Sequence, residues 1–486
     1  MITFIISIIL LVAGYFLYGR LIERIFGIDP ERATCATTKQ DGVDYIPMKP
    51  WKIFLIQFLN IAGVGPIFGA IMGAQFGTAS FLWIVFGSIF AGAVHDYLSG
   101  MISLRMDGAS LPEIHGKYLG NGVKQFMRGF MVILMILVGA VFVSAPASLL
   151  SSLTSWKMIY WIIIIFVYYA IATLLPIDKI IGKIYPIFGI CLLFMVVSIM
   201  FAIFWYQPEL PEIWEGMPNT HPQADANPIF PMMFISIACG AISGFHATQS
   251  PLMARCMVNE KQGRPIFYGA MITEGIVALV WAAAATCFFA KSAEFGIDPS
   301  DAFTTDAGTI VDKISRHWLG TAGAILALLG VVAAPITSGD TAFRSARLIV
   351  SDFTHLSQKP IRNRLLIALP LFAAGIGILV FSMLDKNGFN IIWRYFAWAN
   401  QILATVTLWA ISVYLYQQRK CFYITLIPAV FMTMVVSTFI FIAPNGGFGL
   451  SPIISYSIGA AITLTVLIIF MVNLAKFKRR LKTNND

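Results

Sequence analysis

Ionisable side chains lie inside long apolar stretches of the sequence. His95 and Asp96 interrupt the stretch 79–103, His246 lies in 229–251 and Glu274 in 266–290. If these stretches cross a bilayer, a charge at the centre costs about 2.5–3.5 kcal/mol, so each group needs a function or a partner. Carboxylates and imidazoles bind and release protons, and imidazole does so near neutral pH. These residue types predict proton binding at membrane depth.

His95 and Asp96 are adjacent, and neighbours on a helix point about 100° apart, so they need not contact one another. Either side chain could take a proton from a cavity that opens to the cytoplasm. Alternatively, Asp96 caps its helix or pairs with a basic loop residue such as Arg105. Both interpretations are open at this stage.

His246 and Glu274 invite different interpretations. We interpret His246 as a contact for a bound solute or as a proton-coupling group, although a neutral imidazole bonded to free carbonyl groups would also fit. Glu274 lies one or two turns inside its stretch, close to the basic loop that holds Arg264. We therefore expect a structural ion pair between Glu274 and Arg264.

Two of the apolar stretches contain glycine and proline near their middle. NIAGVGPIFG occupies 60–69, and CGAISGFH occupies 239–246, followed by Gln249-Ser250-Pro251. Proline removes a backbone donor and glycine permits non-helical dihedral angles, so both helices are expected to be interrupted. The two stretches are five spans apart, and this odd separation makes them antiparallel. Matched interruptions in antiparallel helices are typical of an inverted repeat with a binding site between discontinuous helices.

A second pair of motifs, SAPAS at 144–148 and AAPITS at 333–338, is also five spans apart. Unwound half-helices expose N–H groups to an anion and C=O groups to a cation. The hydroxyl groups of Thr337 and Ser338 could complete the oxygen shell of a cation. The spacing of four between glycines from Gly65 to Gly73 also fits simple close packing of helices, and this alternative stays open.

The elements that position these residues are membrane-spanning helices. The chain has 486 residues, of which 58% are hydrophobic and only 12% charged. Soluble domains are about one-quarter charged, so a fold of this size would lack polar side chains to cover its surface in water. A spanning helix needs about 20 apolar residues. Thirteen stretches qualify: 2–19, 53–77, 79–103, 129–151, 158–177, 186–206, 229–251, 266–290, 319–339, 365–384, 391–416, 421–443 and 452–475.

Basic residues in the loops predict the orientation of the chain. With the N-terminus outside, most of the 33 Lys and Arg residues fall in loops after odd-numbered spans and in the tail, as cytoplasmic loops require. The loop 207–228 has no basic residue and is expected outside. The sequence predicts a cytoplasmic-membrane protein with its C-terminus inside. The net charge of +9 arises in these loops and does not predict nucleic-acid binding.

No metal-ligand spacing, phosphate-binding loop or nucleophile motif occurs in the sequence, so we expect no enzyme, no cofactor, no resident metal and no ATP-driven motor. Six scattered cysteines are interpreted as small buried residues. The matched interruptions favour a secondary transporter. A channel would need a continuous polar pore, and a nutrient sensor would need a signalling domain. The expected partners are a small solute, a coupling ion and the bilayer.

Several of these motifs together resemble the carbon starvation protein A family. The resemblance rests on NIAGVGPIFG at 60–69, AGAVHD at 91–96, SLPE at 110–113, SGFHATQSP at 243–251 and APITSGD at 334–340, and this chain looks like a shorter member. It implies an inner-membrane transporter linked to carbon starvation, with peptide uptake or, in one branch, pyruvate–proton symport. A symporter of amino acids is the alternative within the same fold.

The resemblance also implies the amino acid–polyamine–organocation superfamily and a leucine-transporter-type fold with five-plus-five inverted repeats. The expected organisation is one all-α membrane domain over 1–486, with a peripheral helix and basic loop at 1–51, repeats at 52–206 and 229–416, and two peripheral helices and a basic tail at 417–486. Expected solute contacts are Gly63, Gly65, Pro66, Ser144, Gly244, Phe245, His246 and Gln249. Expected sites for a proton or a sodium ion are Ala62, Gly65, Thr337, Ser338, His95 and Asp96.

Overall fold

The computed structural model describes residues 1–42, 44–154, 156–174, 177–358, 360–384, 388–444 and 446–483. Within these ranges the chain forms helices and loops and has no β-strand. The α-helices are α1 (Ile2–Phe16), α2 (Tyr18–Phe26), α3 (Cys35–Thr38), α4 (Pro50–Ile61), α5 (Ala70–Ala74), α6 (Ala79–Gly87), α7 (Ala93–Arg105), α8 (Leu111–Leu119), α9 (Asn121–Leu153), α10 (Met158–Leu174), α11 (Ile177–Tyr206), α12 (Phe234–Ile237), α13 (Gly244–Ala254), α14 (Gly269–Ala290), α15 (Ala307–Thr354), α16 (Ile361–Leu384), α17 (Gly388–Gln417), α18 (Tyr423–Ile442) and α19 (Pro452–Thr483).

Many of these helices are suited to a bilayer. Eleven in the described residues are long and apolar enough to cross a membrane, and the bent pair Pro50–Ile61 and Gly65–Ala74 provides a twelfth if it counts as one span. The apolar helix Met158–Ala172 is shorter. The prediction of an all-α, multi-pass membrane protein is therefore confirmed. The count of 13 spans stays a prediction.

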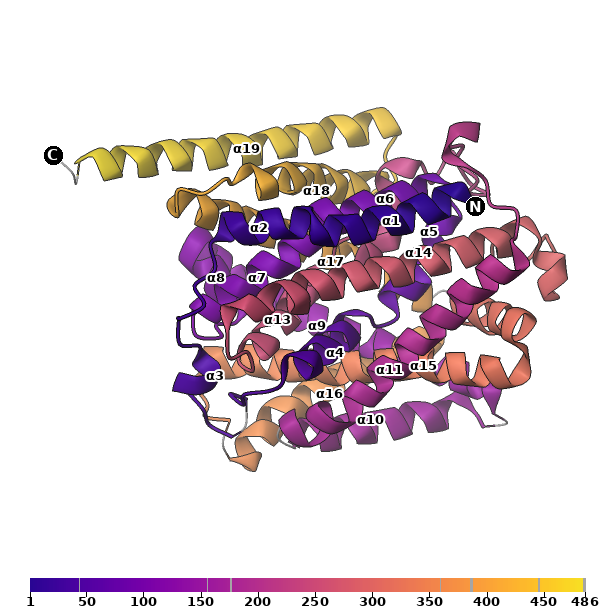
Figure 1. Ribbon diagram of the computed structural model, residues 1–486, viewed down its shortest axis with the longest axis horizontal. Helices are drawn as coiled ribbons and strands as arrows, with labels where there is room; N and C mark the ends of the chain where they lie inside the picture. Colours follow the sequence, from indigo (N-terminus) through magenta and orange to yellow (C-terminus); the bar gives the residue numbers. More distant parts are fainter. Residues whose placement is uncertain are drawn as a thin grey trace.

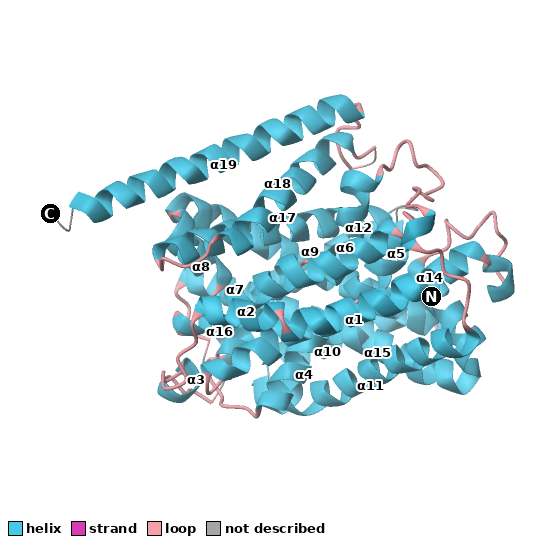
Figure 2. Cartoon of the chain, turned by 45° about the horizontal axis from the view of Figure 1, so that its top comes forward, coloured by secondary structure: helices cyan, strands magenta, loops and turns pink. Residues whose placement is uncertain are grey.

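Most of the long helices run side by side, and α19 lies along one edge with its C-terminal end beyond the other helices (Figure 1). The view in Figure 2, turned by 45°, shows the same splayed α19 and the loops gathered at the helix ends. In the interior, α15 packs against α9 and α11, and α13 packs against α7. Helix α4 packs against α11, α13, α14 and α15. The outer faces of α10, α16 and α19 expose large apolar side chains, as contact with lipid requires.

Helix α15 is longer than its apolar stretch. The apolar stretch covers 319–339, whereas α15 continues to Thr354. The helix continues because the polar residues that follow are buried in protein. Asp340 is fully buried, and its Oδ2 accepts a hydrogen bond of 2.7 Å from the hydroxyl of Tyr185. Protein contacts therefore replace water at this end of the helix.

Candidate functional site

The first expected interruption is present. Helix α4 ends at Ile61, the chain leaves the helical conformation at Ala62, and a π-helical turn, Gly65–Gly69, begins the second half of the span. The two halves are bent by 52°. Pro66 occupies the start of the π-helical turn, where its missing N–H costs little.

The second expected interruption is also present. Helix α12 ends at Ile237, Ala238 has a positive φ of 35°, and the chain is extended at Ser243 before α13 begins at Gly244. Helix α17 holds this segment. Asn400 Oδ1 accepts hydrogen bonds from Phe245 N at 2.7 Å and from Ser243 Oγ at 3.1 Å, and Gln401 Nε2 donates to the carbonyl of Ile242 at 2.8 Å. These amides satisfy backbone groups that the interrupted helix leaves free.

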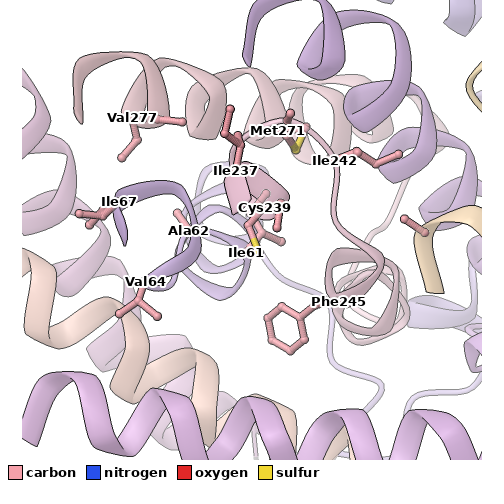
Figure 3. Packing of buried hydrophobic residues seen from close by; sticks show 14 of the residues in the cluster. Ile61, Ala62, Val64, Ile67, Ile237, Cys239, Ile242, Phe245, Met271 and Val277 are labelled. Carbon is pink, nitrogen blue, oxygen red and sulfur yellow. The ribbon is translucent and has the colours of Figure 1, made fainter. Parts of the chain in front are cut away.

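The two interruptions contact one another directly. A Cβ on Gly65 would lie 2.4 Å from Cys239 Cβ, and a Cβ on Gly69 would lie 2.8 Å from the carbonyl oxygen of Ile237. Figure 3 shows side chains of both segments, Ile61 to Ile67 and Ile237 to Phe245, around one buried cluster. The glycine spacing therefore does serve close packing, and this packing joins the two non-helical segments.

Replacing Gly65 by Ala is expected to destabilise the protein by about 1–3 kcal/mol, because the methyl group would overlap Cys239. A thermal-unfolding series of the purified protein measures this loss. Cys239→Gly in the same chain should recover part of it in a double-mutant cycle. Gly122→Ala is the control, since nothing lies within 4 Å of its added Cβ. Equal unfolding temperatures for Gly65→Ala and the control would contradict the contact.

Beside the second interruption lies a buried cluster of acidic and imidazole groups. Asp96 Oδ1 lies 2.7 Å from His95 Nδ1, and Asp96 Oδ2 lies 2.8 Å from His246 Nδ1. On the other edge of the same ring, His246 Nε2 lies 3.3 Å from Glu274 Oε2. All four side chains are fully buried. The structure thus brings the sequence-predicted His95, Asp96 and His246 together and adds Glu274.

Two alternatives from the sequence are wrong. Glu274 does not pair with Arg264, whose Nε lies 3.0 Å from Glu23 Oε2 on α2. Asp96 does not pair with Arg105, which makes two hydrogen bonds of 2.8–2.9 Å to Glu260. In both cases a carboxylate far along the chain takes the arginine, so the buried acids keep imidazoles as partners.

Glycine at position 92 sets the distance between α7 and the second interruption. A Cβ there would lie 2.2 Å from the carbonyl oxygen of Ala241, so a larger residue would push the helices apart. Asp96 follows Gly92 by four residues and lies on the same face of the helix. One turn earlier, Ser88 Oγ donates to the freed carbonyl of Gly240 at 3.1 Å. Close approach therefore brings Asp96 within reach of His246.

Other predicted residues lie on helices that surround the two interruptions and the buried cluster. Ser338 Oγ on α15 donates to the carbonyl of Leu59 at 3.0 Å, next to the first interruption, whereas Thr337 Oγ1 donates to carbonyls of its own helix. Gln249 Nε2 lies 2.8 Å from Thr248 Oγ1 and 3.4 Å from Ser345 Oγ. Ser144 is buried within α9, two residues after Phe142, whose ring packs edge-on against Phe245.

Sequence reasoning did not assign three residues to the candidate site. Glu274 was given the wrong partner, and Asn400 and Gln401 were not considered. A signal for the last two exists, because adjacent amides in the middle of an apolar span are costly unless they are bonded. Among described residues, no group of three or more His, Cys, Asp and Glu side chains could hold a metal ion.

A large cavity opens on one side of the interruptions. Its volume is about 920 Å³, and it is lined by Phe68 and Met72 of the first broken span, Ser236 of the second, and Trp393 and Arg394 of α17. The ring centroids of Phe68 and Trp393 lie 6.1 Å apart. At the other end of α13, a hollow beside Thr248 and Arg255 measures only about 20 Å³. The larger of the two hollows therefore lies on the side that carries the loop 221–227.

Solved structures with a similar fold include membrane transporters. The manganese transporter of Eremococcus coleocola superposes with a TM-score of 0.56 at 12% sequence identity, covering 90% of this chain and 99% of that one. At this identity the similarity concerns the fold alone.

Curated relatives are more informative. An uncharacterized membrane protein of Haemophilus influenzae is 45% identical over 340 residues, which are 60% of this chain and 91% of the relative. The peptide transporter CstA of Campylobacter jejuni is 26% identical over 86% of this chain and 76% of its own length. The pyruvate/proton symporter BtsT of Escherichia coli is 29% identical over 56% of this chain and 46% of its own length. The family model of the carbon starvation protein CstA matches residues 1–160, 145–322 and 290–439, and the chain belongs to this family.

Proposed function

We propose that this protein is a secondary active transporter that takes up small carboxylates such as pyruvate, or peptides, together with protons. The relatives named as a peptide transporter and as a pyruvate/proton symporter support the class of solute. The observation that carries the proposal is the fully buried contact of 3.3 Å between His246 Nε2 and Glu274 Oε2.

This contact requires one proton. An ionised Asp96 can only accept, so the Nδ1 atoms of His95 and His246 both donate to it at 2.7 and 2.8 Å. His246 Nε2 then faces Glu274 either as an N–H donor or as a lone pair that accepts from a protonated carboxyl. Without that proton, a lone pair and a carboxylate would face each other at a buried position and repel. Loss of the proton therefore favours separation of α13 from α14.

The same movement would release a solute. His246 follows the non-helical residues of the second broken span, and those residues pack on Gly65 and Gly69 of the first. We propose that the solute rests where the interruptions meet, against Gly63, Gly65, Pro66, Ser144, Gly244, Phe245, His246 and Gln249. Its anionic group would meet freed N–H groups. The same position of α13 then favours both a protonated His246–Glu274 pair and a bound solute, which couples the two.

The wider architecture proposed is that of the sequence prediction. It has 13 spans, two inverted five-helix repeats within 52–206 and 229–416, peripheral helices in 1–51 and 417–486, an outer N-terminus and a cytoplasmic C-terminus. The cavity of about 920 Å³ is then an outer vestibule, because His221, Pro222, Gln223 and Asn227 of the predicted outer loop line it. A second cation position between Ala62, Gly65, Thr337 and Ser338 is the site that a sodium-coupled carrier would use.

Uptake by proteoliposomes tests the proposal. With an inward gradient of one pH unit and no sodium, labelled pyruvate or dialanine is expected to accumulate about tenfold, because one unit of pH stores about 1.4 kcal/mol per proton. An imposed sodium gradient at equal pH should produce no accumulation. Accumulation driven by sodium alone would contradict the proton assignment, and failure of both solutes under both gradients would contradict the proposed function.

A further inference from the structure

Helix α4 carries two buried amide side chains that have no hydrogen-bond partner among the described residues. Gln57 and Asn60 are fully buried, and none of their four side-chain nitrogen and oxygen atoms is bonded. The Oε1 atom of Gln249 on α13 is likewise unbonded, as is Oε1 of Glu274 on α14, whose Oε2 faces His246. Native proteins rarely leave buried polar atoms unsatisfied, and such groups usually mark a place for ordered water or a ligand. The question is whether these atoms face one common space.

The neighbours of α4 show which way the amides point. Phe54 lies near Gly269 of α14, Leu55 lies near Gly189 of α11, and the Leu59 carbonyl bonds Ser338 of α15. At about 100° per residue these three positions span about 140° of the helix circumference, and Gln57 and Asn60 both lie in the remaining arc. The remaining close neighbour of α4 among the long helices is α13. The amides therefore face α13.

Helix α13 directs polar side chains toward the face of α4 that carries these amides. Gly244 meets α17, and Phe245 meets Phe142 of α9. His246 contacts Glu274 of α14, and Gln249 contacts Ser345 of α15. Because α4 packs against both α14 and α15, it meets α13 between His246 and Gln249. The unbonded atoms of three helices thus border one seam that ends at the His246–Glu274 pair.

We propose that the seam between α4 and α13 is hydrated and forms the cytoplasmic leg of the proton's route. Amide side chains suit this role, since each both donates and accepts and can hold a water chain without titrating. The proton leaves the His246–Glu274 pair for the nearest water, and the far end of the chain passes a proton to the cytoplasm. No other reactant is needed. Asp96 and His95 of α7 are the other titratable groups at the inner end.

The direction of this route follows from the course of α4. Gln57 lies one turn nearer than Asn60 to Pro50, where the helix begins after the basic loop 20–49. The charge distribution predicts this loop on the cytoplasmic side. The inference rests on the proposed function for the use of the proton, whereas hydration of the seam can be measured without it.

Cysteine labelling tests hydration independently of any solute. In a chain whose six native cysteines are replaced, Gln57→Cys and Asn60→Cys are expected to react with aminoethyl methanethiosulfonate, because a hydrated thiolate attacks this reagent and displaces methanesulfinate. Leu59→Cys, equally buried on another face of α4, is the matched control and should react at least about tenfold more slowly. Equal rates for all three variants would overturn a hydrated seam.

Transport then tests the role of the water. The double variant Gln57→Leu with Asn60→Leu should lower the ratio of pH-driven pyruvate accumulation to pyruvate exchange about tenfold, because exchange needs no net proton release. Gln57→Asn with Asn60→Gln keeps two amides and should restore most of the ratio. An unchanged ratio in the leucine variant would overturn the route. If the unsubstituted protein fails to accumulate pyruvate under a pH gradient, the proposed function is contradicted. The cysteine labelling then still tests whether the seam is hydrated.

Discussion

Glu274→Gln is expected to lower the initial rate of pH-driven solute uptake about a hundredfold, the effect of removing a group that exchanges a proton in the essential step. The amide has the size of the carboxylic acid and can donate to His246 Nε2, which lies 3.3 Å from the carboxylate. It therefore keeps the packed arrangement of α13 and α14. It cannot lose a proton, so the repulsion that would separate the two helices never develops.

The measurement compares accumulation under a pH gradient with exchange of labelled for unlabelled solute in the same proteoliposomes. Exchange should fall far less than accumulation. Exchange needs no net release of a proton, so a carrier that keeps its proton can still return with the unlabelled solute. Glu209→Gln is the matched control, because this carboxylate is 90% exposed near Lys291. If Glu274→Gln accumulates solute as Glu209→Gln does, Glu274 has a structural role only. The main support for proton coupling is then removed.

The second large effect is expected at Asn400, an uncharged amide that bonds the backbone of Phe245 and the hydroxyl of Ser243. Asn400→Leu would leave the backbone N–H of Phe245 and the hydroxyl of Ser243 without their acceptor, in a place where neither atom can reach water. Each orphaned group costs about 1–3 kcal/mol, so we expect a loss of about 2–6 kcal/mol in stability. Uptake should be abolished, because the non-helical conformation at Ser243 is no longer held.

Thermal unfolding of the purified variant and uptake at a temperature where it remains folded separate the two effects. Gln418→Leu removes an exposed amide just beyond the same helix and should change neither quantity. If Asn400→Leu unfolded at the same temperature as Gln418→Leu, the amide would not be what maintains the interruption.

The interruptions of the helices could be predicted from the sequence because their cause is local. Gly65, Pro66 and Gly244 alter the backbone wherever they occur, so composition alone located both non-helical segments. The position of His246 beside the second interruption could be predicted as well, because His246 follows Gly244 by two residues. The count of spans was less secure, since the stretch 158–177 corresponds to an apolar helix, Met158–Ala172, that is short for a span.

The partners of the charged residues could not be predicted in this way. Glu274 and Arg264 are ten positions apart and of opposite charge, yet Arg264 bonds Glu23, more than two hundred residues away along the chain. Arg105 likewise bonds Glu260 rather than nearby Asp96. Such pairings are decided by how helices pack, and close approach at Gly92 determines that Asp96 meets His246. Only the fold reveals which of several chemically plausible partners is within reach.

The unequal hollows on the two sides of the centre have a consequence for the energetics of the cycle. A cavity of about 920 Å³ holds roughly 30 molecules of liquid water, at about 30 Å³ each. In the proposed transport cycle, closure of this cavity over a solute would return most of that liquid to the bulk. The balance between open and closed arrangements would then depend on external osmolality, so concentrated polymers too large to enter the cavity should favour closure whatever solute is carried.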